Sequence, residues 1–354
     1  MPLSIGQLLH NRYQIQSLLG QGGMGSVYRA LDQVLYRVVA IKERIPDHNA
    51  FPQHLAQARL QFQREAQILG VLSHANLPHI YDFFTENGNE YVVMELISGE
   101  NLEEAVRQHG AINEGAVYAW TMQVLDALIF IHNQNIIHRD IKPANLLLKP
   151  DGKVLLVDFG LVKLVDPNNP RTITALRTVG TAEYAPLEQF SVGMHTDARS
   201  DIYSLGATLY HLLTGRVPLD VPSRLINPSQ LASPRSVKFA ISPAMEQVVL
   251  RAMEIRPQDR FQSAVEMREA LKASTGTRLP PSTVPATYET PTPAPGAKYV
   301  RASVQTNAEL SEMIEQALRD SRQARPADPQ AGSKSSPSGG ESEILEQLHN
   351  LLGG

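Results

Sequence analysis

Two short stretches carry the residues whose types and spacing could do chemistry. Residues 138–145 read HRDIKPAN, and residues 158–160 read DFG. Between them, residues 149–153 form a turn signal flanked by two apolar runs, a pattern typical of a β-hairpin. We therefore expect Asp140, Asn145 and Asp158 to face one cleft.

Such a cluster suits phosphoryl transfer. The transferred group carries charge on its oxygens, so a divalent cation must bridge the phosphates, and hard cations take oxygen ligands. Asp158 and Asn145 offer those oxygens, and Asp140 would orient an acceptor hydroxyl and take its proton. A single Asp-Phe-Gly is more often a turn with a buried Phe. The ordered pair of stretches across a hairpin is the stronger signal.

A glycine-rich segment precedes this cluster. Residues 20–28 read GQGGMGSVY, so Gly20, Gly22 and Gly25 are spaced as G-x-G-x-x-G and Val27 follows. A backbone without side chains can close over phosphates and donate N–H groups to them. A dinucleotide-binding motif would open a helix here. Residues 26–30 instead continue as a strand, which favours a phosphate-covering hairpin.

Further elements must position these groups. Residues 38–42 are an apolar strand ending in Lys42, which alone reads equally well as a solvated strand end. Strands are predicted over 77–84 and 90–96. Helices are predicted over 57–72, 113–134, 201–213, 242–253 and 263–272. Helix 113–134 would deliver the catalytic loop.

Taken in order, these motifs resemble the eukaryotic-type (Hanks-type) serine/threonine protein kinase family, and this chain looks like a bacterial member. The resemblance covers residues 12–272. It implies an α+β, two-lobed fold with a small β-rich N-lobe, a larger helical C-lobe and a largely disordered C-terminal tail. It also implies transfer of the γ-phosphoryl group of ATP to protein Ser or Thr hydroxyls.

The resemblance assigns roles to individual residues. Asp140 and Lys142 would serve catalysis together with Lys42, which Glu65 would hold. Mg²⁺, with Mn²⁺ as an alternative, would sit on Asn145 and Asp158. The ATP-binding residues would be Gly20, Gly22, Gly25, Val27, Lys42, Met94, Glu95, Ile97 and Asn101. Structural roles fall to Arg139, Phe159, Gly160, Thr181, Glu188, Asp201 and Arg260.

One segment departs from the family pattern. Residues 180–188 read GTAEYAPLE, with Pro186 one residue early and Leu187 where proline is expected. Glu188 keeps its register and would pair with Arg260. Asp201 would bond the catalytic-loop backbone, although a helix N-cap is the plainer interpretation.

The polar segment 165–179 reads as a mobile loop. Arg139 needs an anionic partner, and a phosphothreonine carries roughly −1.5 to −2 charge, enough to pin a loop to an arginine. We expect autophosphorylation of this loop, at Thr174 first, with Thr172 and Thr178 as alternatives. The plainer interpretation is that these are ordinary polar loop residues.

The sequence changes character after residue 272. Residues 273–305 are a Pro/Thr-rich linker, 306–325 a short amphipathic helix, 326–340 a second linker and 341–354 another short amphipathic helix. Two short helices cannot build a core, so they would dock on a partner or stay frayed. An alternative function is therefore a catalytically weak kinase-fold scaffold with an interacting tail. A small-molecule kinase would lack the 180–188 segment.

The composition of the chain further limits which kinds of partner and site it can have. A formal charge of −4 gives no reason to expect nucleic acid as a partner, and a sequence without cysteine excludes disulfides and thiolate sites. No apolar run approaches the ~18 residues of a membrane span; residues 124–131 are interrupted by Asp126. The expected partners are protein substrates and ATP, in the cytoplasm, with no transmembrane segment.

Overall fold

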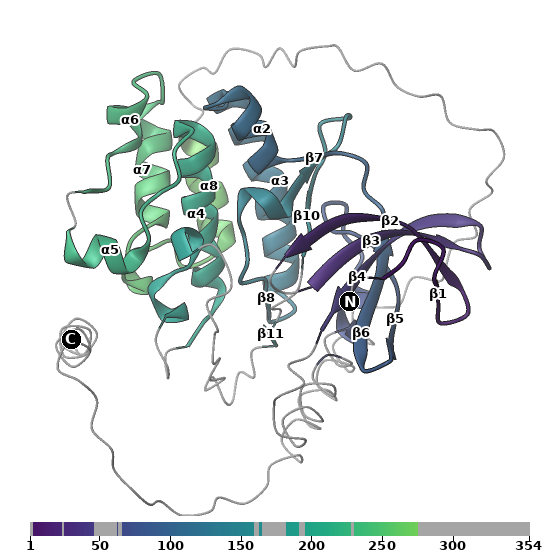
Figure 1. Ribbon diagram of the computed structural model, residues 1–354. Coiled ribbons are helices and arrows are strands. Elements are labelled where there is room, and N and C mark those ends of the chain that lie inside the picture. Colours follow the sequence, from purple (N-terminus) through teal and green to yellow (C-terminus); the bar gives the residue numbers. More distant parts are fainter. Residues whose placement is uncertain are drawn as a thin grey trace, which may run out of the picture. The chain divides into compact units, whose positions relative to one another are not determined.

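The computed structural model describes residues 3–22, 25–45, 62, 66–158, 163–164, 182–190, 195–227 and 230–274. A β-rich N-terminal part is followed by a helical part (Figure 1), which is the α+β division that we predicted. The helical part also contains two small sheets.

The N-terminal part is an antiparallel sheet with the strand order β1-β2-β3-β4-β6-β5. Its strands are β1 (Leu8–Leu9), β2 (Tyr13–Gly22), β3 (Gly25–Asp32), β4 (Arg37–Arg44), β5 (Ile80–Glu86) and β6 (Asn89–Glu95). Alternate side chains, among them Tyr13, Tyr28, Ile41 and Tyr91, are buried in one cluster. This period of two places the neighbouring residue Lys42 on the other face.

The strand that we predicted over 77–84 begins later than expected. Leu77 donates its N–H to the carbonyl of His74 in a turn, and Pro78 has no N–H to give a ladder. β5 therefore starts at Ile80. It joins β6 through Asn87 and Gly88, whose φ angles of 50° and 82° match the left-handed positions of a tight hairpin turn.

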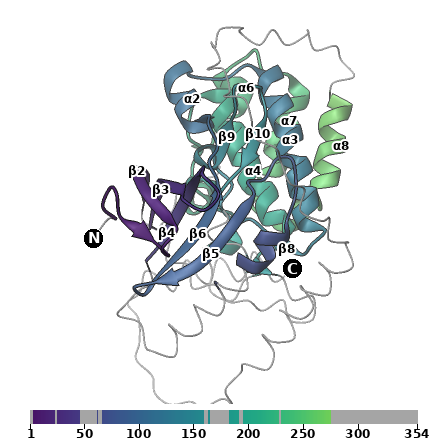
Figure 2. The same cartoon turned by 90° about the vertical axis from the view of Figure 1, so that its right-hand side faces the viewer.

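The helical part is built around α4 (Ala198–Thr214), in which every residue from Ser200 to Thr214 is buried. The other helices are α2 (Leu102–His109), α3 (Glu114–His132), α5 (Val221–Ile226), α6 (Pro234–Val237), α7 (Pro243–Ala252) and α8 (Ala264–Ser274). α4 packs against α3, α7 and α8, and Figure 2 shows α3, α4 and α7 together.

The N-terminus of α4 corrects one interpretation. Asp197, not Asp201, is the N-cap, and it forms a reciprocal capping box with Ser200. The helix therefore begins a turn earlier than predicted, and Asp201 lies inside it. Gly215 ends the helix at φ 69°, as expected of a left-handed C-cap.

Short strands and turns complete the helical part. β7 (Glu100–Asn101), β9 (Leu146–Leu148) and β10 (Val154–Leu156) form one sheet, in which β9 and β10 are the predicted hairpin. β8 (Ile136–Ile137) pairs with β11 (Lys163–Leu164). Four 3-10 turns are described: η1 (Pro143–Asn145), η2 (Ala182–Tyr184), η3 (Leu187–Gln189) and η5 (Pro257–Asp259).

Helix α3 matches the prediction closely, with Asn113 as its N-cap. In the described part of the chain it is the one helix that is long and apolar enough to cross a membrane by length and composition. Val117, Leu125 and Leu128 of this helix are fully buried, and the helix packs against α4 and α8. This is the setting of a core helix.

Candidate active site

The catalytic loop between β8 and β9 brings Asp140, Lys142 and Asn145 together. The amide nitrogen of Asn145 donates to the backbone carbonyl of Asp140 (2.7 Å) and to its carboxylate Oδ2 (2.8 Å). Lys142 Nζ lies 3.0 Å from the same Oδ2. Because both groups hold Oδ2, the orientation of the carboxylate is set, and Oδ1 is the oxygen that can accept a proton from a hydroxyl.

Asp201 of α4 holds the backbone of this loop in place. Its buried carboxylate accepts hydrogen bonds from the backbone N–H groups of Arg139 (2.8 Å) and His138 (2.9 Å), and it contacts His132 Nε2 at 2.8 Å. Burial alone would raise the pKa of Asp201, but the hydrogen bond and charge of His132 outweigh burial and lower it. The predicted contact between Asp201 and the loop backbone is present.

These bonds offset a strained backbone. Arg139 has φ 70°, a conformation that costs a non-glycine residue about 1–3 kcal/mol. Asp158 also has a positive φ, of 67°. Two residues beside the candidate reaction centre are therefore held in unfavourable conformations by their surroundings.

His138 links the loop to the strand that leads to Asp158. Its Nε2 donates to the carbonyl of Val157 (3.1 Å), and its Nδ1 accepts from the N–H of Asp140 (3.4 Å). Burial lowers the pKa of His138. A neutral imidazole satisfies both contacts, so the residue works as a structural bridge and not as a base.

Asp158 lies against Lys42, which extends from β4. Nζ of Lys42 donates to Oδ1 of Asp158. Burial would raise the pKa of Asp158, but the charge and hydrogen bond of Lys42 lower it, so the carboxylate is ionised at neutral pH. The structure thus pairs Lys42 with Asp158. Glu65, its expected partner, lies outside the described residues.

The donor set fits a hard divalent cation. Because Nδ2 of Asn145 is bound to Asp140, its amide oxygen Oδ1 is left as a possible ligand. Asp158 adds an ionised carboxylate. No group of three or more His, Cys, Asp or Glu gathers as a metal site in the described residues. One carboxylate and one amide match Mg²⁺, which usually keeps waters and substrate phosphates as its other ligands.

The glycine hairpin depends on Gly25. Gly22 and Gly25 are cross-strand partners, as are Gly20 and Val27. Gly25 has φ 136°, and a Cβ there would stand 1.9 Å from the carbonyl oxygen of Glu43. Only glycine fits so close to a backbone oxygen. At Gly20 an added Cβ would meet nothing within 4 Å.

The expected adenine-binding segment follows β6. Met94 pairs with Ala40 of β4, and the N–H of Glu95 donates to the carbonyl of His79 (2.8 Å). Ile97 lies between β6 and β7. The side chain of Asn101, predicted to contact ribose, accepts from the N–H of Glu104 (2.8 Å) as the N-cap of α2. Its oxygen therefore has a structural task of its own.

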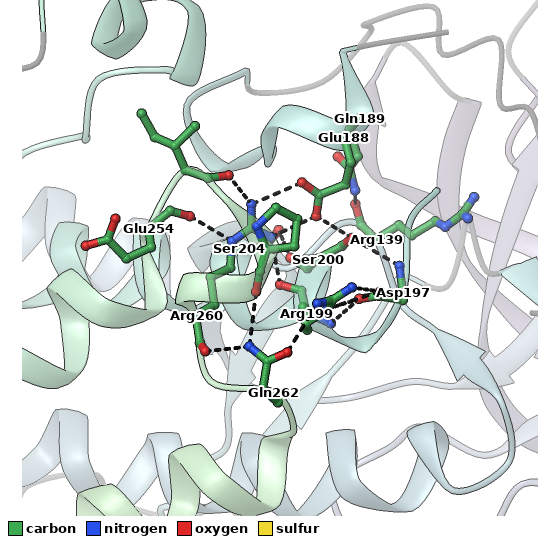
Figure 3. A network of polar contacts seen from close by, with 12 residues as sticks. Arg139, Glu188, Gln189, Asp197, Arg199, Ser200, Ser204, Glu254, Arg260 and Gln262 are labelled. Carbon is green, nitrogen blue, oxygen red and sulfur yellow. Dashed lines mark hydrogen bonds and ion pairs between the residues drawn. The ribbon is translucent and has the colours of Figure 1, made fainter. Parts of the chain in front are cut away.

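A buried ion pair anchors the segment after the loop (Figure 3). Arg260 binds Glu188 bidentately, with distances of 2.7 and 3.0 Å, and both side chains are almost completely buried. Ser200 Oγ adds a hydrogen bond to Glu188 (2.7 Å). The predicted partnership of Glu188 and Arg260 is present, and Leu187 in place of the expected proline is accommodated in η3.

The structure also shows residues that sequence reasoning missed. Arg139 is buried, and its Nη2 donates to the hydroxyl of Thr196, while Gln189 donates to the carbonyl of Arg139 (3.2 Å). His132 contacts Asp201 across 69 positions. Nothing local in the sequence marks Thr196 or His132. The N-cap of α2 could have been found from Asn101 followed by Glu103 and Glu104.

Several predicted residues lie outside the described part of the chain. Besides Glu65, these are Phe159, Gly160, Thr172, Thr174, Thr178 and Thr181, together with the linkers and helices predicted after residue 274.

Comparisons with known proteins agree with this geometry. A family model described as "Protein kinase domain" matches residues 13–332. The chain is 38% identical over 293 residues to serine/threonine-protein kinase PksC of Streptomyces coelicolor, covering 78% of this chain and 52% of that protein. It is 38% identical over 275 residues to serine/threonine-protein kinase PknB of Mycolicibacterium smegmatis, covering 75% and 43%.

A third relative is serine/threonine-protein kinase B of Synechocystis, which is 35% identical over 277 residues, covering 75% of this chain and 47% of that protein. The chain thus spans about half the length of the curated relatives that it matches.

Proposed function

This chain belongs to the protein kinase domain family, and on that premise we propose that it transfers the γ-phosphoryl group of ATP to serine or threonine hydroxyls of proteins. The observation that carries the proposal is the cluster of Asp140, Lys142 and Asn145 in one loop, together with the contact between Lys42 and Asp158. The named kinases among its relatives support the choice of serine and threonine.

The proposed reaction follows from these contacts. The acceptor oxygen bonds to the γ-phosphorus while the bond from that phosphorus to the β–γ bridging oxygen breaks, and ADP leaves. Asp140 takes the hydroxyl proton, and Lys142, 3.0 Å from that carboxylate, is placed to balance charge on the moving group. The glycine hairpin and Lys42 would hold the phosphates of ATP.

The site contributes mainly position and electrostatics. A loose transition state requires little activation of the nucleophile, so a fixed carboxylate and nearby cations suffice. Mg²⁺, held by Asn145 and Asp158, would neutralise phosphate charge and hold the triphosphate in place. Asp201 and His138 would act on the reaction through the loop backbone that they hold.

Labelled ATP tests the proposal. We expect the wild-type chain with ATP and Mg²⁺ to transfer label to Ser or Thr of a mixed protein substrate, and Asp140→Asn to lose nearly all transfer while still binding ATP. Asp126→Asn, which alters an exposed carboxylate on α3, is the matched control. Label found elsewhere than on Ser or Thr, or full activity in Asp140→Asn, would contradict the proposal.

We further propose that the chain phosphorylates its own loop, at Thr174 first, then Thr172 or Thr178. The positions of these threonines between residues 165 and 179, with Arg171 and Arg177 nearby, support this. Mass spectrometry after incubation with ATP and Mg²⁺ should find phosphate there, and the triple alanine variant should be less active. An unphosphorylated loop or a fully active variant would end the idea.

A further inference from the structure

A polar cavity lies apart from the catalytic cluster. It has a volume of about 280 Å³ and is bordered by the segment before β5, the end of β6 and the β9–β10 hairpin. Its polar lining residues are Ser73, His74, His79, Glu95, Lys149 and Lys153. Asp140, Asn145 and Asp158 do not line it.

The two lysines are opposed across the hairpin. Lys149 donates its N–H to the carbonyl of Lys153 (2.8 Å), directly beside the paired residues Leu148 and Val154. Cross-strand partners project their side chains to the same face, about 5 Å apart at Cβ, where like charges repel. Both lysines are half-buried. The fold thus holds two positive charges together on one wall.

In the described part of the chain, no carboxylate is paired with either of these lysines. Neither lysine makes an ion pair or side-chain hydrogen bond with a described residue. Asp151 accepts the backbone N–H of Lys153 (3.0 Å). Glu95 also lines the cavity, and its Oε2 lies 3.5 Å from the backbone nitrogen of His79. These two carboxylates therefore contact backbone N–H groups and neither lysine.

The remaining walls add hydrogen-bond donors. Burial lowers the pKa of His74, so its imidazole is neutral near pH 7. Nδ1 of His74 accepts from the N–H of Asn76 (3.1 Å), which leaves the proton on Nε2 as a donor. His79 and the hydroxyl of Ser73 are exposed at the rim.

We propose that this cavity is a binding site for a phosphoryl group. Lysine ammonium groups bind phosphate as point charges, and two of them match the roughly −1.5 to −2 charge of a phosphoryl group better than the single charge of a carboxylate. The ligand relieves the repulsion between Lys149 and Lys153. Binding at this site requires no catalytic activity of the chain, so the inference can be tested independently of the proposed reaction.

Calorimetric titration of the full chain tests the site with two probes. One is inorganic phosphate, and the other is a blocked phosphoserine pentapeptide beside its unphosphorylated form. We expect inorganic phosphate and the phosphoserine peptide to bind, and the unphosphorylated peptide not to bind. A peptide that binds more tightly than inorganic phosphate identifies a phosphoprotein as the source. Equal affinities identify free phosphate, and both results support the site.

Variants locate the binding. Lys149→Gln and Lys153→Gln should each weaken phosphate binding roughly tenfold, the loss of one hydrogen bond to a charged group. Glu95→Gln should strengthen it several-fold, because a negative charge leaves the lining. This opposite change keeps the test valid if a lysine variant folds poorly.

Two controls separate this site from others. Lys272→Gln, which alters a lysine paired with Glu269 on α8, should change nothing. Lys42→Met should also leave phosphate binding intact, because Lys42 does not line the cavity. A phosphate bound at the catalytic cluster would instead lose affinity in this variant. The proposal is overturned if Lys149→Gln and Lys153→Gln bind phosphate as tightly as wild type. It is also overturned if neither inorganic phosphate nor the phosphoserine peptide binds.

Discussion

Replacing Arg260 by methionine should cost the protein a large part of its stability. The guanidinium has five N–H donors, and the structure gives each an acceptor. Two go to Glu188 (2.7 and 3.0 Å), and three go to the backbone carbonyls of Glu254 (2.7 Å), Arg199 (3.0 Å) and Ile255 (2.8 Å). Methionine fills similar volume but satisfies none of these acceptors.

The magnitude follows from burial. Neither Arg260 nor Glu188 is exposed beyond 1% of its side chain, so the variant leaves a buried carboxylate without its cation. Breaking such a pair from one side costs about 3–5 kcal/mol, a large share of the 5–15 kcal/mol that stabilises a typical domain. With a urea m-value of about 2–3 kcal/mol/M, the unfolding midpoint should fall by about 1–2.5 M.

Urea denaturation followed by circular dichroism measures this shift. Arg251→Met is the matched control, because Arg251 forms an exposed pair with Glu266 (2.5 Å), and exposed pairs contribute about 0–1 kcal/mol. The double variant Glu188→Gln/Arg260→Met should lose less than the sum of the single changes, since no unpaired charge remains. An Arg260→Met midpoint as close to wild type as that of Arg251→Met would refute the reasoning.

Two further predictions follow from the site. Gly25→Ala should destabilise the hairpin by about 1–3 kcal/mol and raise the Kd for ATP, because the added Cβ would meet the carbonyl of Glu43. Gly20→Ala, with no atom near its added Cβ, should preserve the stability and the Kd for ATP. Equal effects of the two substitutions would contradict this prediction. Burial lowers the pKa of His138 and of His211, so at these two positions the unfolded chain binds protons at a higher pH than the native chain. Their contribution to the free energy of unfolding is therefore present above the ordinary histidine pKa of about 6.5 and is lost as the pH falls below it. The urea midpoints at pH 7.5 and 5.5 should therefore differ more in wild type than in His138→Gln. An equal difference in the two proteins would show that the pKa of His138 is not lowered on folding.

The sequence was informative where a function depends on residues close together in the chain. Asp140, Lys142 and Asn145 lie within six positions, so their meeting follows from one loop, and the β9–β10 hairpin follows from a turn between apolar runs. Helix α3 was predicted on the same local grounds, whereas the α+β division was predicted through the family resemblance.

Partners distant in the sequence could not be predicted from pattern alone. His132 and Asp201 are 69 positions apart, and Arg139 and Thr196 are 57 apart. The first contact depends on how α3 packs against α4, and the second joins the catalytic loop to the segment before α4. The pairing of Glu188 with Arg260, 72 positions apart, was predicted only through the family resemblance.

Local signals also compete. Asp197 and Asp201 both suit the start of a helix, and the reciprocal bond with Ser200 decides for Asp197. Asn101 suits both a ribose contact and a helix cap, and the structure shows it as a cap. A short polar side chain serves many purposes, so its residue type alone does not decide among them.

The transfer rate of Asp158→Ala, measured in a single turnover with labelled ATP and Mg²⁺, tests the central claim most directly. Asp158 is the carboxylate that contacts Lys42 and, with Asn145, would hold Mg²⁺. We predict that the variant loses nearly all transfer, while its free energy of unfolding stays within about 1 kcal/mol of wild type, because the side chain is one-third exposed. A folded Asp158→Ala variant that retains most of the wild-type rate would contradict the assignment of this cluster as the catalytic centre.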